Sequence, residues 1–579
     1  MALSFAMSFA ANAADNCDRN CLTQIADGYF NAMALHSAAS LRLSPEVRFT
    51  ENGRSMKLGE GFWKTAGKVT YRSDIADPET GGIGIEAIVM EGAKPVLMLV
   101  RLKVAQGMIS EAETIVCREG DDSHWGVENL VTPPALFTRP IRVAERDSRH
   151  QIMAAADAYF RAFETEGTSS YVRAPFASDV ERYENGVHTT NVSRNGREPR
   201  TPGQQFDMGQ YKNARIYDRR YPVVDVERGV VLSIIRFGRK TDASGNEIAM
   251  LRADGAAIPK PDNSPLVAEW FAVRNGTIRE IRAVLIRHGN DAPTGWPAEP
   301  VGDCGRDCLK RITDRYFASL AANSLADLPL GKSIKYTENG RQMKMGEGFW
   351  KTAGRTTYRL DAYDPESGGA GVSAVVMEHG KPAMVTVRLR VVDKVIVEAE
   401  TIIVRKDHAG VNFRPGWLTH PSAHFVRPLR PAEQNSRLEL MAAADAYYRA
   451  FETAGTVDYV PAPFLPDTDR FENGVQMTNT SVGGKTRTTI AEEFESPNFL
   501  NGHAYERRYP VVDVERGIVL AIVGVDSQPR PDGIAKPRGE TTETTRAALA
   551  SDMFSINAGK IREVQRVLVP AQMHSSSGW

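Results

Sequence analysis

The chain repeats itself, and this constrains its fold more than any other feature. The stretch TENGRSMKLGEGFWKTAG, which begins at Thr50, returns as TENGRQMKMGEGFWKTAG at Thr337. Over residues 47–72 and 334–359, 19 of 26 positions are identical at a constant offset of 287 residues. A fixed offset of this kind indicates tandem duplication. A chain of 579 residues also exceeds what one hydrophobic core usually holds, so several domains are expected.

Each half is itself composed of two related units. Four elements recur four times in the same order: an aromatic pair in a helix, Glu-Asn-Gly, Asp-x-Glu-x-Gly and Ile-x-Glu. The two central motifs begin at Glu51 and Asp77, Glu184 and Asp225, Glu338 and Asp364, and Glu472 and Asp513. They are 26 residues apart in the first and third units, and 41 residues apart in the second and fourth. We therefore predict the order A1-B1-A2-B2.

The predicted domain boundaries follow from this order. They are a signal peptide over 1–14, A1 over 15–145, B1 over 146–290, A2 over 301–435 and B2 over 436–571. Two Pro-rich segments, 119–148 and 407–436, share the pattern Phe-x-Arg-Pro, and we expect them to pack as straps after each A unit. The polar stretches 239–265 and 528–546 are predicted to be surface loops of the B units.

The first residues are typical of an exported protein. Leu3–Ala10 is a short apolar stretch, and the following Ala-Asn-Ala fits a small-residue cleavage site, although a basic segment in front of it is missing. We predict a signal peptide and a periplasmic or secreted location, with a plain flexible N-terminus as the alternative.

The five cysteines agree with export. Two pairs lie four residues apart at predicted helix starts, which is within disulfide range, and we predict the bonds Cys17–Cys21 and Cys304–Cys308. Two thiolates without a nearby His or further Cys provide too few ligands for a metal, so no metal site is predicted. Cys117 aligns with a Val in the other half, which indicates a packed core position.

The charge and hydropathy of the chain argue against two classes of partner. The net charge of −1 gives no general attraction to nucleic acid. No run of about 18 apolar residues is present, so no membrane span is predicted.

One A unit has a regular pattern of elements. Helical periodicity over 18–36 is followed by a short strand that ends at the Asn-Gly turn, and by a short helix or turn over 59–65. Four β-branched strands separated by turn signals then follow, at 69–73, 83–91, 95–104 and 108–117. The predicted fold class is α+β, with four tandem cone-shaped units, each a curved antiparallel sheet wrapped around N-terminal helices.

Three stretches of the A units carry a resemblance to a known fold. They are the strand-turn FTENG or YTENG, the following GEGFWKT, and the closing ISEAETIV or VIVEAETIIV. In these features the chain resembles the nuclear transport factor two-like superfamily, and within it the SnoaL-like polyketide cyclase group. The resemblance implies a hollow cone that holds a small molecule, and acid/base catalysis by Asp, Glu, His, Tyr or Arg without a cofactor. It also implies sheet-to-sheet pairing, so that the A and B units would form internal pseudo-dimers.

The near identity of the two halves offers a way to choose candidate residues. A group that acts in both halves should occur at matched positions, and no histidine does so; His124, for example, is matched with Val411. Histidines are therefore interpreted as surface residues. The matched candidates for catalysis are Tyr71, Arg101, Glu113, Tyr358, Arg388 and Glu400 in the A units, and Arg220, Tyr221, Asp225, Arg508, Tyr509 and Asp513 in the B units. Trp63 and Trp350 are candidates for stacking on a substrate.

Each candidate also has a structural interpretation. Ile109, Glu111, Glu113 and Ile115 are predicted to share one strand face, where Glu–Arg pairs are common on solvated sheets. Asp225 and Asp513 fit a turn, and the two tryptophans fit core anchors. The leading functional prediction is a cofactor-independent lyase, isomerase or hydrolase that acts on a small aromatic or polyketide-like molecule. The alternative is a non-enzymatic ligand-binding or scaffold protein built of pseudo-dimeric repeats.

Overall fold

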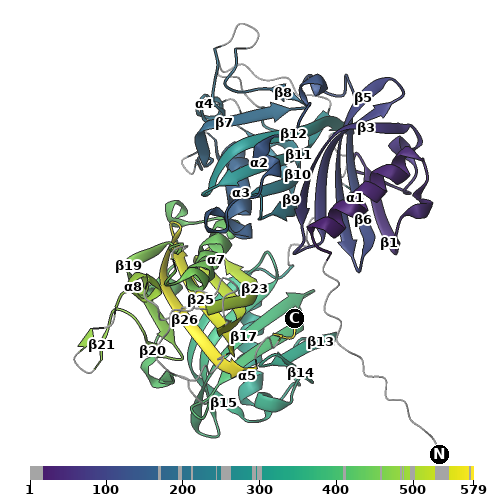
Figure 1. Ribbon diagram of the computed structural model, residues 1–579. Coiled ribbons are helices and arrows are strands. Elements are labelled where there is room, and N and C mark those ends of the chain that lie inside the picture. The colour runs from purple at the N-terminus through teal and green to yellow at the C-terminus, as the bar shows by residue number, and fades with distance from the viewer. Residues whose placement is uncertain are drawn as a thin grey trace, which may run out of the picture. The chain divides into compact units, whose positions relative to one another are not determined.

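The fold is built from four similar six-stranded sheets, seen in a computed structural model (Figure 1). It describes residues 17–579 except 167, 169–170, 194–197, 210, 212, 243, 245, 250–262, 290–294, 297–302, 409–411, 457–458, 483–484, 487, 496–501, 528–546 and 573–575. The chain divides into two compact halves, Met1–Ala298 and Glu299–Trp579, and each half contains two of the sheets. The predicted tandem repeats are thereby confirmed. The predicted signal peptide and the loop 528–546 lie outside the described residues, as does most of the loop 239–265.

The first half holds units A1 and B1. A1 comprises α1 (Arg19–Ala34), η1 (Ala38–Ser40), β1 (Leu43–Glu51), β2 (Arg54–Met56), η2 (Gly61–Lys64), β3 (Ala66–Asp77), β4 (Gly82–Glu91), β5 (Lys94–Ala105) and β6 (Met108–Cys117). The strap that follows contains η3 (Val127–Asn129), α2 (Ala135–Thr138) and η4 (Val143–Glu145). B1 comprises α3 (Arg149–Thr165), β7 (Phe176–Glu184), β8 (Val187–His188), α4 (Pro202–Asp207), β9 (Ala214–Asp225), β10 (Val230–Arg239), β11 (Asn263–Arg274) and β12 (Thr277–Gly289).

The second half repeats this plan. A2 comprises α5 (Arg306–Ala321), β13 (Leu330–Glu338), β14 (Arg341–Met343), η5 (Gly348–Lys351), β15 (Ala353–Asp364), β16 (Gly369–Glu378), β17 (Lys381–Val392) and β18 (Val395–Val404). Its strap contains η6 (Pro415–Trp417), α6 (Ala423–Val426) and η7 (Pro431–Glu433). B2 comprises α7 (Arg437–Thr453), β19 (Phe464–Glu472), β20 (Val475–Gln476), β21 (Ser481–Val482), β22 (Lys485–Thr486), α8 (Ile490–Glu495), β23 (Gly502–Asp513), β24 (Ile518–Ser527), β25 (Ala547–Asn557) and β26 (Lys560–Ala571).

The prediction of a wholly antiparallel sheet is wrong. In A1 the strand order is β2-β1-β6-β5-β4-β3, and β1 pairs with β6 in parallel, whereas the other neighbours are antiparallel. The chain leaves the β1–β2 hairpin and crosses to the far edge before it starts the meander β3–β6. The last strand of the meander then returns beside β1 in the same direction. The other three units have the corresponding order.

The Glu-Asn-Gly corner occupies the same place in all four units. In B1, Asn185 adopts a left-handed conformation with φ 46°, and its backbone N–H donates to the carbonyl of Ala283 at 2.9 Å. The Asn185 side chain also bonds both backbone groups of Leu285, each at 2.9 Å. The corresponding backbone bonds of the other corners are Asn52 to Thr114, Asn339 to Thr401 and Asn473 to Arg566. This shared bond fixes equivalent positions on the last strand of each unit.

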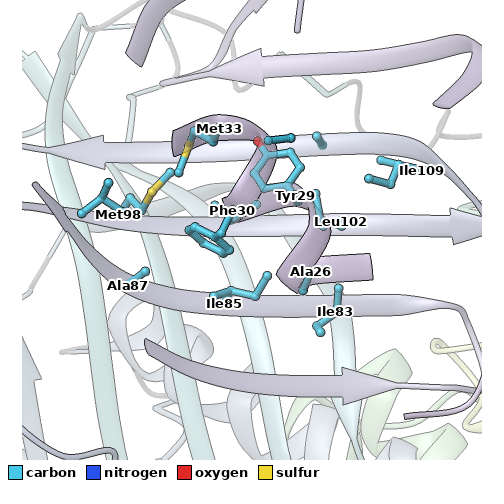
Figure 2. Close-up of a cluster of buried hydrophobic side chains, with 14 of the residues drawn as sticks. Ala26, Tyr29, Phe30, Met33, Ile83, Ile85, Ala87, Met98, Leu102 and Ile109 are labelled. Atoms are coloured by element: carbon cyan, nitrogen blue, oxygen red, sulfur yellow. The ribbon is translucent and has the colours of Figure 1, made fainter. Parts of the chain in front are cut away.

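A helix covers one face of each sheet and fills the interior of the A units. Asp18 caps α1 by accepting from the Cys21 N–H at 2.8 Å. The buried face of α1 then packs onto alternate residues of the central strands (Figure 2). Ala26, Tyr29, Phe30 and Met33 lie against Ile83, Ile85, Ala87, Met98 and Leu102.

The opposite faces of the A1 and B1 sheets pack on each other around a second core. A reciprocal pair of carboxylates closes this interface, because Asp77 accepts from the Val224 N–H and Asp225 accepts from the Ala76 N–H, both at 3.1 Å. The helix of each unit supplies an arginine to the carboxylate of the other unit. The second half has the same arrangement, with Asp364 on Val512 and Asp513 on Tyr363, both at 3.0 Å. The Asp-x-Glu-x-Gly motif is therefore the clamp of an A–B pair.

The face prediction for β6 is wrong at Ile109. A register shift between Lys103 and Val104 places one extra residue in β6, and Ile109 consequently packs in the helix-side core. Ile115 packs between the two sheets, as does the buried Cys117.

The structure contains the disulfides Cys17–Cys21 and Cys304–Cys308, each with its Cα atoms 5.2 Å apart. Within the described ranges, no helix is both long and apolar enough to cross a bilayer.

Candidate functional site

A pocket of about 200 Å³ lies in B1, between α3 and the sheet face that is turned away from A1. Most of its wall is apolar and includes Phe160, Phe163, Phe237, Val267 and Leu285. Polar side chains reach it from the strap, from α3 and from strands β7, β11 and β12. Apolar walls with a few convergent polar groups are typical of small-molecule sites.

Glu269 is the buried acid of the pocket. It projects from β11 directly opposite Ala283 on β12, and its residue is 7% exposed. The Tyr159 hydroxyl donates to Glu269 Oε1 at 3.3 Å. Burial raises the pKa of Glu269 to about 8, although the charge of Arg182 acts in the opposite direction. This carboxyl therefore carries its proton at neutral pH, and exchanges it near the pH at which proteins work.

Arg182 organises the hydroxyl groups around this acid. Its guanidinium donates to the hydroxyls of Tyr159 at 3.5 Å and of Tyr211 at 3.3 Å. It also pairs with Glu184, the first residue of the Glu-Asn-Gly corner, at 3.1 Å. The corner thus places a charged pair at the edge of the pocket, while α3 places Tyr159 and its neighbouring phenylalanines over the sheet.

The strap contributes a histidine to the pocket wall. His124 Nδ1 lies 3.1 Å from Asp122 Oδ1 and 3.2 Å from Glu184 Oε2. Arg287 pairs with the other oxygen of Asp122 at 3.2 Å. Burial alone would raise the pKa of Asp122, but the hydrogen bonds from His124 and the charge of Arg287 lower it below its ordinary value. His124 is therefore held in a polar network with Asp122 and Glu184 in the pocket wall, where its side chain is 28% exposed.

The match of His124 with Val411 is wrong. In the second half Asn412 makes the equivalent contact, donating to Glu472 at 3.0 Å, because one extra residue between β18 and the strap changes the offset from 287 to 288. The histidine in the wall is thus replaced by an amide in B2.

One equivalent pair of positions in the unit interiors is the same in the two A units but differs in the two B units. The pair consists of the residue fixed by the Asn corner and its cross-strand neighbour. It is Thr114 with Val100 in A1, Ala283 with Glu269 in B1, Thr401 with Val387 in A2, and Arg566 with Asp552 in B2. A small residue opposite a carboxylic acid occurs in B1, the unit with the pocket.

Most of the matched candidates lie between the two sheets of an A–B pair instead. The Arg220 guanidinium of B1 donates to Glu113 of A1 at 2.6 Å, and Arg101 donates to the same carboxylate at 3.2 Å. In the second half Arg508 donates to Glu400 at 2.6 Å, and Arg388 Nη1 lies 4.0 Å from Glu400. The sheet face that carries these pairs is buried by the partner sheet, so the interpretation of a solvated face is wrong.

The candidate tyrosines are buried in the same way. Tyr71 donates to Glu86 at 3.2 Å, and Tyr358 donates to Gln565 at 2.8 Å. Burial raises the pKa of both phenols above the ordinary value, which makes them poor proton donors to a base at neutral pH. Neither residue lines the pocket.

The matched residues of the B strand tie the helix and the interface together. Tyr221 donates to Asp157 of α3 at 3.0 Å, and Tyr509 donates to Asp445 of α7 at 2.6 Å. Asp225 accepts from the Arg228 N–H in the turn at 3.1 Å, in addition to its place in the clamp. Asp513 does the same in the second half, accepting from the Arg516 N–H at 3.2 Å. The turn interpretation of both aspartates therefore agrees with the structure.

The two candidate tryptophans lie in the cores of the A units. Trp63 is 1% exposed, donates to the Tyr29 hydroxyl at 3.2 Å and meets the Tyr29 ring edge to face. Trp350 is equally buried, and its ring meets the Tyr316 ring edge to face. Their rings are covered by neighbouring side chains, as the core interpretation expects.

The described part of the chain holds no cluster of three or more His, Cys, Asp or Glu placed to bind a metal ion.

The comparisons with known proteins single out the B units. A family model described as a domain of unknown function, DUF8021, matches residues 145–285 and 433–568. These segments begin near the starts of α3 and α7, and the first of them contains Glu269, Tyr159 and Arg182. No curated protein matches the chain.

Proposed function

We propose that the chain is an exported, cofactor-independent enzyme of lyase, isomerase or hydrolase type whose working site is the B1 pocket. The observation that carries the proposal is the buried Glu269, whose pKa of about 8 lies near physiological pH. Acid/base groups of enzymes work best when their pKa is close to the operating pH, and perturbed groups in pockets mark candidate sites.

The geometry suggests a role for each polar group. Glu269 exchanges a proton with the substrate at the inner end of the pocket, and Tyr159 hydrogen-bonds the same carboxyl. Arg182 orients the two phenol hydroxyls, and His124 Nδ1 lies 3.2 Å from Glu184 in the pocket wall. The aromatic wall favours a small aromatic or polyketide-like substrate.

The setting of the site supports the same proposal. We propose that each unit is a SnoaL-like cone, that the A–B pairs act as internal pseudo-dimers, and that the chain works in the periplasm or outside the cell. The two disulfides support export, because such bonds persist in oxidising compartments.

The proposal is tested by combining ligand screening with product analysis. Small aromatic and polyketide-like compounds are screened by thermal shift on the full chain, since a bound ligand raises the unfolding midpoint. Compounds that bind are then incubated with wild type, Glu269→Gln and His124→Asn, and products are followed by mass spectrometry. We expect Glu269→Gln to lose turnover by a factor of at least about 100, the lower range of general acid/base contributions. Turnover that is unchanged in Glu269→Gln would refute the proposal.

A non-enzymatic role remains the second candidate, and one observation favours it. The A1 interior is packed with its own aromatic core, and a buried ion pair lies in the B2 interior. Binding without turnover for every compound that shifts the unfolding midpoint would support a ligand-binding protein over an enzyme.

A further inference from the structure

The interior of B2 contains a planar cation bound to a carboxylate. Arg566 Nε donates to Asp552 Oδ1 at 2.7 Å, and Nη2 donates to Oδ2 at 2.9 Å. The Tyr448 hydroxyl donates to the same carboxylate at 2.6 Å, and the guanidinium carbon lies 5.6 Å from the centre of the Tyr447 ring. Both members of the pair are buried, with exposures of 0% for Asp552 and 5% for Arg566. The pair is thus a side-on guanidinium–carboxylate contact against an aromatic ring.

B1 retains part of this arrangement: Phe160 stands at the position of Tyr448, and the hydroxyl on the acid comes from Tyr159 instead. Glu269 stands at the position of Asp552, and Tyr159 at the position of Tyr447, since both tyrosines open the aromatic pair of their helix. Ala283 stands at the position of Arg566, and the space in front of it belongs to the pocket. The hollow therefore lies where a guanidinium lies in the other half.

The charges around the pocket leave Glu269 without a cationic partner. Arg182 pairs with Glu184 at 3.1 Å, and Arg287 pairs with Asp122 at 3.2 Å. Among the described residues, no ion pair involves Glu269, and its side-chain hydrogen bond comes from the Tyr159 hydroxyl. A buried carboxyl in this situation binds either a proton or an external cation.

We propose that the B1 pocket binds a small molecule with a planar cationic head, an amidinium or a guanidinium, which pairs with Glu269 in the place that Arg566 takes in B2. The remainder of the molecule lies against the aromatic wall, where a cation also gains from the ring faces. The inference deepens the proposed function, because it names the ligand class of the same site. Glu269, the acid of the proposed function, then anchors the head group in its ionised form.

The ion pair requires Glu269 to ionise, which makes proton release a signature of binding. The carboxyl has a pKa of about 8 in the empty pocket, so roughly nine-tenths of the molecules carry its proton at pH 7. Binding of an amidinium turns the carboxylic acid into a carboxylate, and the proton passes to the buffer. A neutral ligand of the same shape releases no proton.

Benzamidine and benzamide provide a matched pair of probes, because they share one shape and differ in charge. Titration calorimetry of the full chain at pH 7, in two buffers of different ionisation enthalpy, gives affinity, stoichiometry and proton release together. We expect one benzamidine per chain, release of nearly one proton, and affinity at least tenfold above that of benzamide. Ala283→Arg should abolish binding by supplying its own guanidinium, and Glu269→Gln should remove both the preference and the proton release. Glu46→Gln, at an exposed carboxylate of the same half, should change nothing.

Several outcomes would overturn the inference. They are equal affinity for benzamide, two benzamidines per chain, no binding of benzamidine at millimolar concentration, or unchanged binding in Glu269→Gln. Because Glu269→Gln preserves the shape of the side chain, it gives the answer even if the bulkier Ala283→Arg fails to fold. A neutral aromatic ligand that binds wild type and is converted in a Glu269-dependent reaction would leave the proposed function standing while refuting the cationic ligand class.

Discussion

Replacing Glu269 by Gln should make the first half of the chain more stable, and the gain should grow with pH. The substitution keeps the shape and hydrogen-bonding capacity of the side chain but removes its charge. The wild-type carboxyl has an ordinary pKa of 4.5 and a folded-state pKa of about 8, raised first of all by burial. The folded state therefore binds the proton more tightly than the unfolded state does. Stability from this group is complete below about pH 4.5, and it is lost as the pH rises to about 8.

The size of the effect follows from the difference between the two pKa values. One pKa unit corresponds to about 1.4 kcal/mol, so the wild type loses up to about 5 kcal/mol between pH 4.5 and pH 8. At pH 7 the loss is about 3 kcal/mol, and the glutamine variant, which does not titrate, would be spared it. For a unit of this size, 1 kcal/mol shifts the unfolding midpoint by about 2–4 °C. Glu269→Gln should thus raise the midpoint by roughly 10–20 °C at pH 9 and by almost nothing at pH 4.5.

Differential scanning calorimetry of the full chain from pH 4.5 to pH 9 measures this dependence. Glu46→Gln, at an exposed carboxylate, serves as the control and should shift the midpoint equally little at every pH. A difference between Glu269→Gln and wild type that is the same at pH 4.5 and pH 9 would refute the argument. Such a result would mean that water or a cation already stabilises the ionised Glu269 carboxylate. The pocket would then not hold an unpaired acid, and the inferred ligand class would lose its basis.

Three further substitutions test the packing of the two halves. Arg566→Ala leaves the buried Asp552 carboxylate without its cation and should destabilise the second half by about 3–5 kcal/mol, seen as a lower unfolding midpoint; a shift below 1 °C would contradict the ion pair. Asp225→Asn removes the charge that Arg19 meets at 2.7 Å in the A–B clamp, and should cost the first half about 3 kcal/mol in denaturant unfolding, unless the clamp adds nothing to stability. Trp296→Ala removes a buried indole that donates to a threonine hydroxyl at 3.0 Å, and should cost about 3 kcal/mol in the same assay; an unchanged transition would show that the indole is not packed in solution.

The repeat pattern predicted the architecture well because it depends on local signals that each unit contains in full. The Asn-Gly corner requires a residue in the left-handed conformation. Asn185 adopts it with φ 46°, and all four units share this corner. The parallel pairing of β1 with β6 could not be read from these signals. Alternating side chains fix which face of a strand is buried, but they do not fix which strand lies beside it. The bulge that turns Ile109 to the helix side is likewise invisible in the alternation of the sequence.

The candidate site was harder to predict because its key residue is ordinary in sequence. Glu269 stands in an apolar strand between Ala and Trp, and its partner Ala283 gives no sign of chemistry. Two differences between the halves could have revealed the site. Glu269 of the first half corresponds to Asp552 of the second, and Ala283 corresponds to Arg566. Where Ala283 of B1 is replaced by Arg566 in B2, the facing acid is retained as the shorter Asp552. This indicates that both positions are buried and in contact, since a buried Arg without a carboxylate is costly.

The candidates were selected because they are identical in the two halves, but the site lies where the two halves differ. The eleven residues RRYPVVDVERG are identical in the two halves, and they hold Asp157 or Asp445 to the strand and close the A–B clamp. Identity between the copies thus marks what both need in order to fold. A working site in one copy is free to differ from its counterpart, because the other copy can fill the same space with its own side chains. B2 has an arginine at this position and B1 an alanine, and the B1 pocket is where we expect the chemistry of this chain.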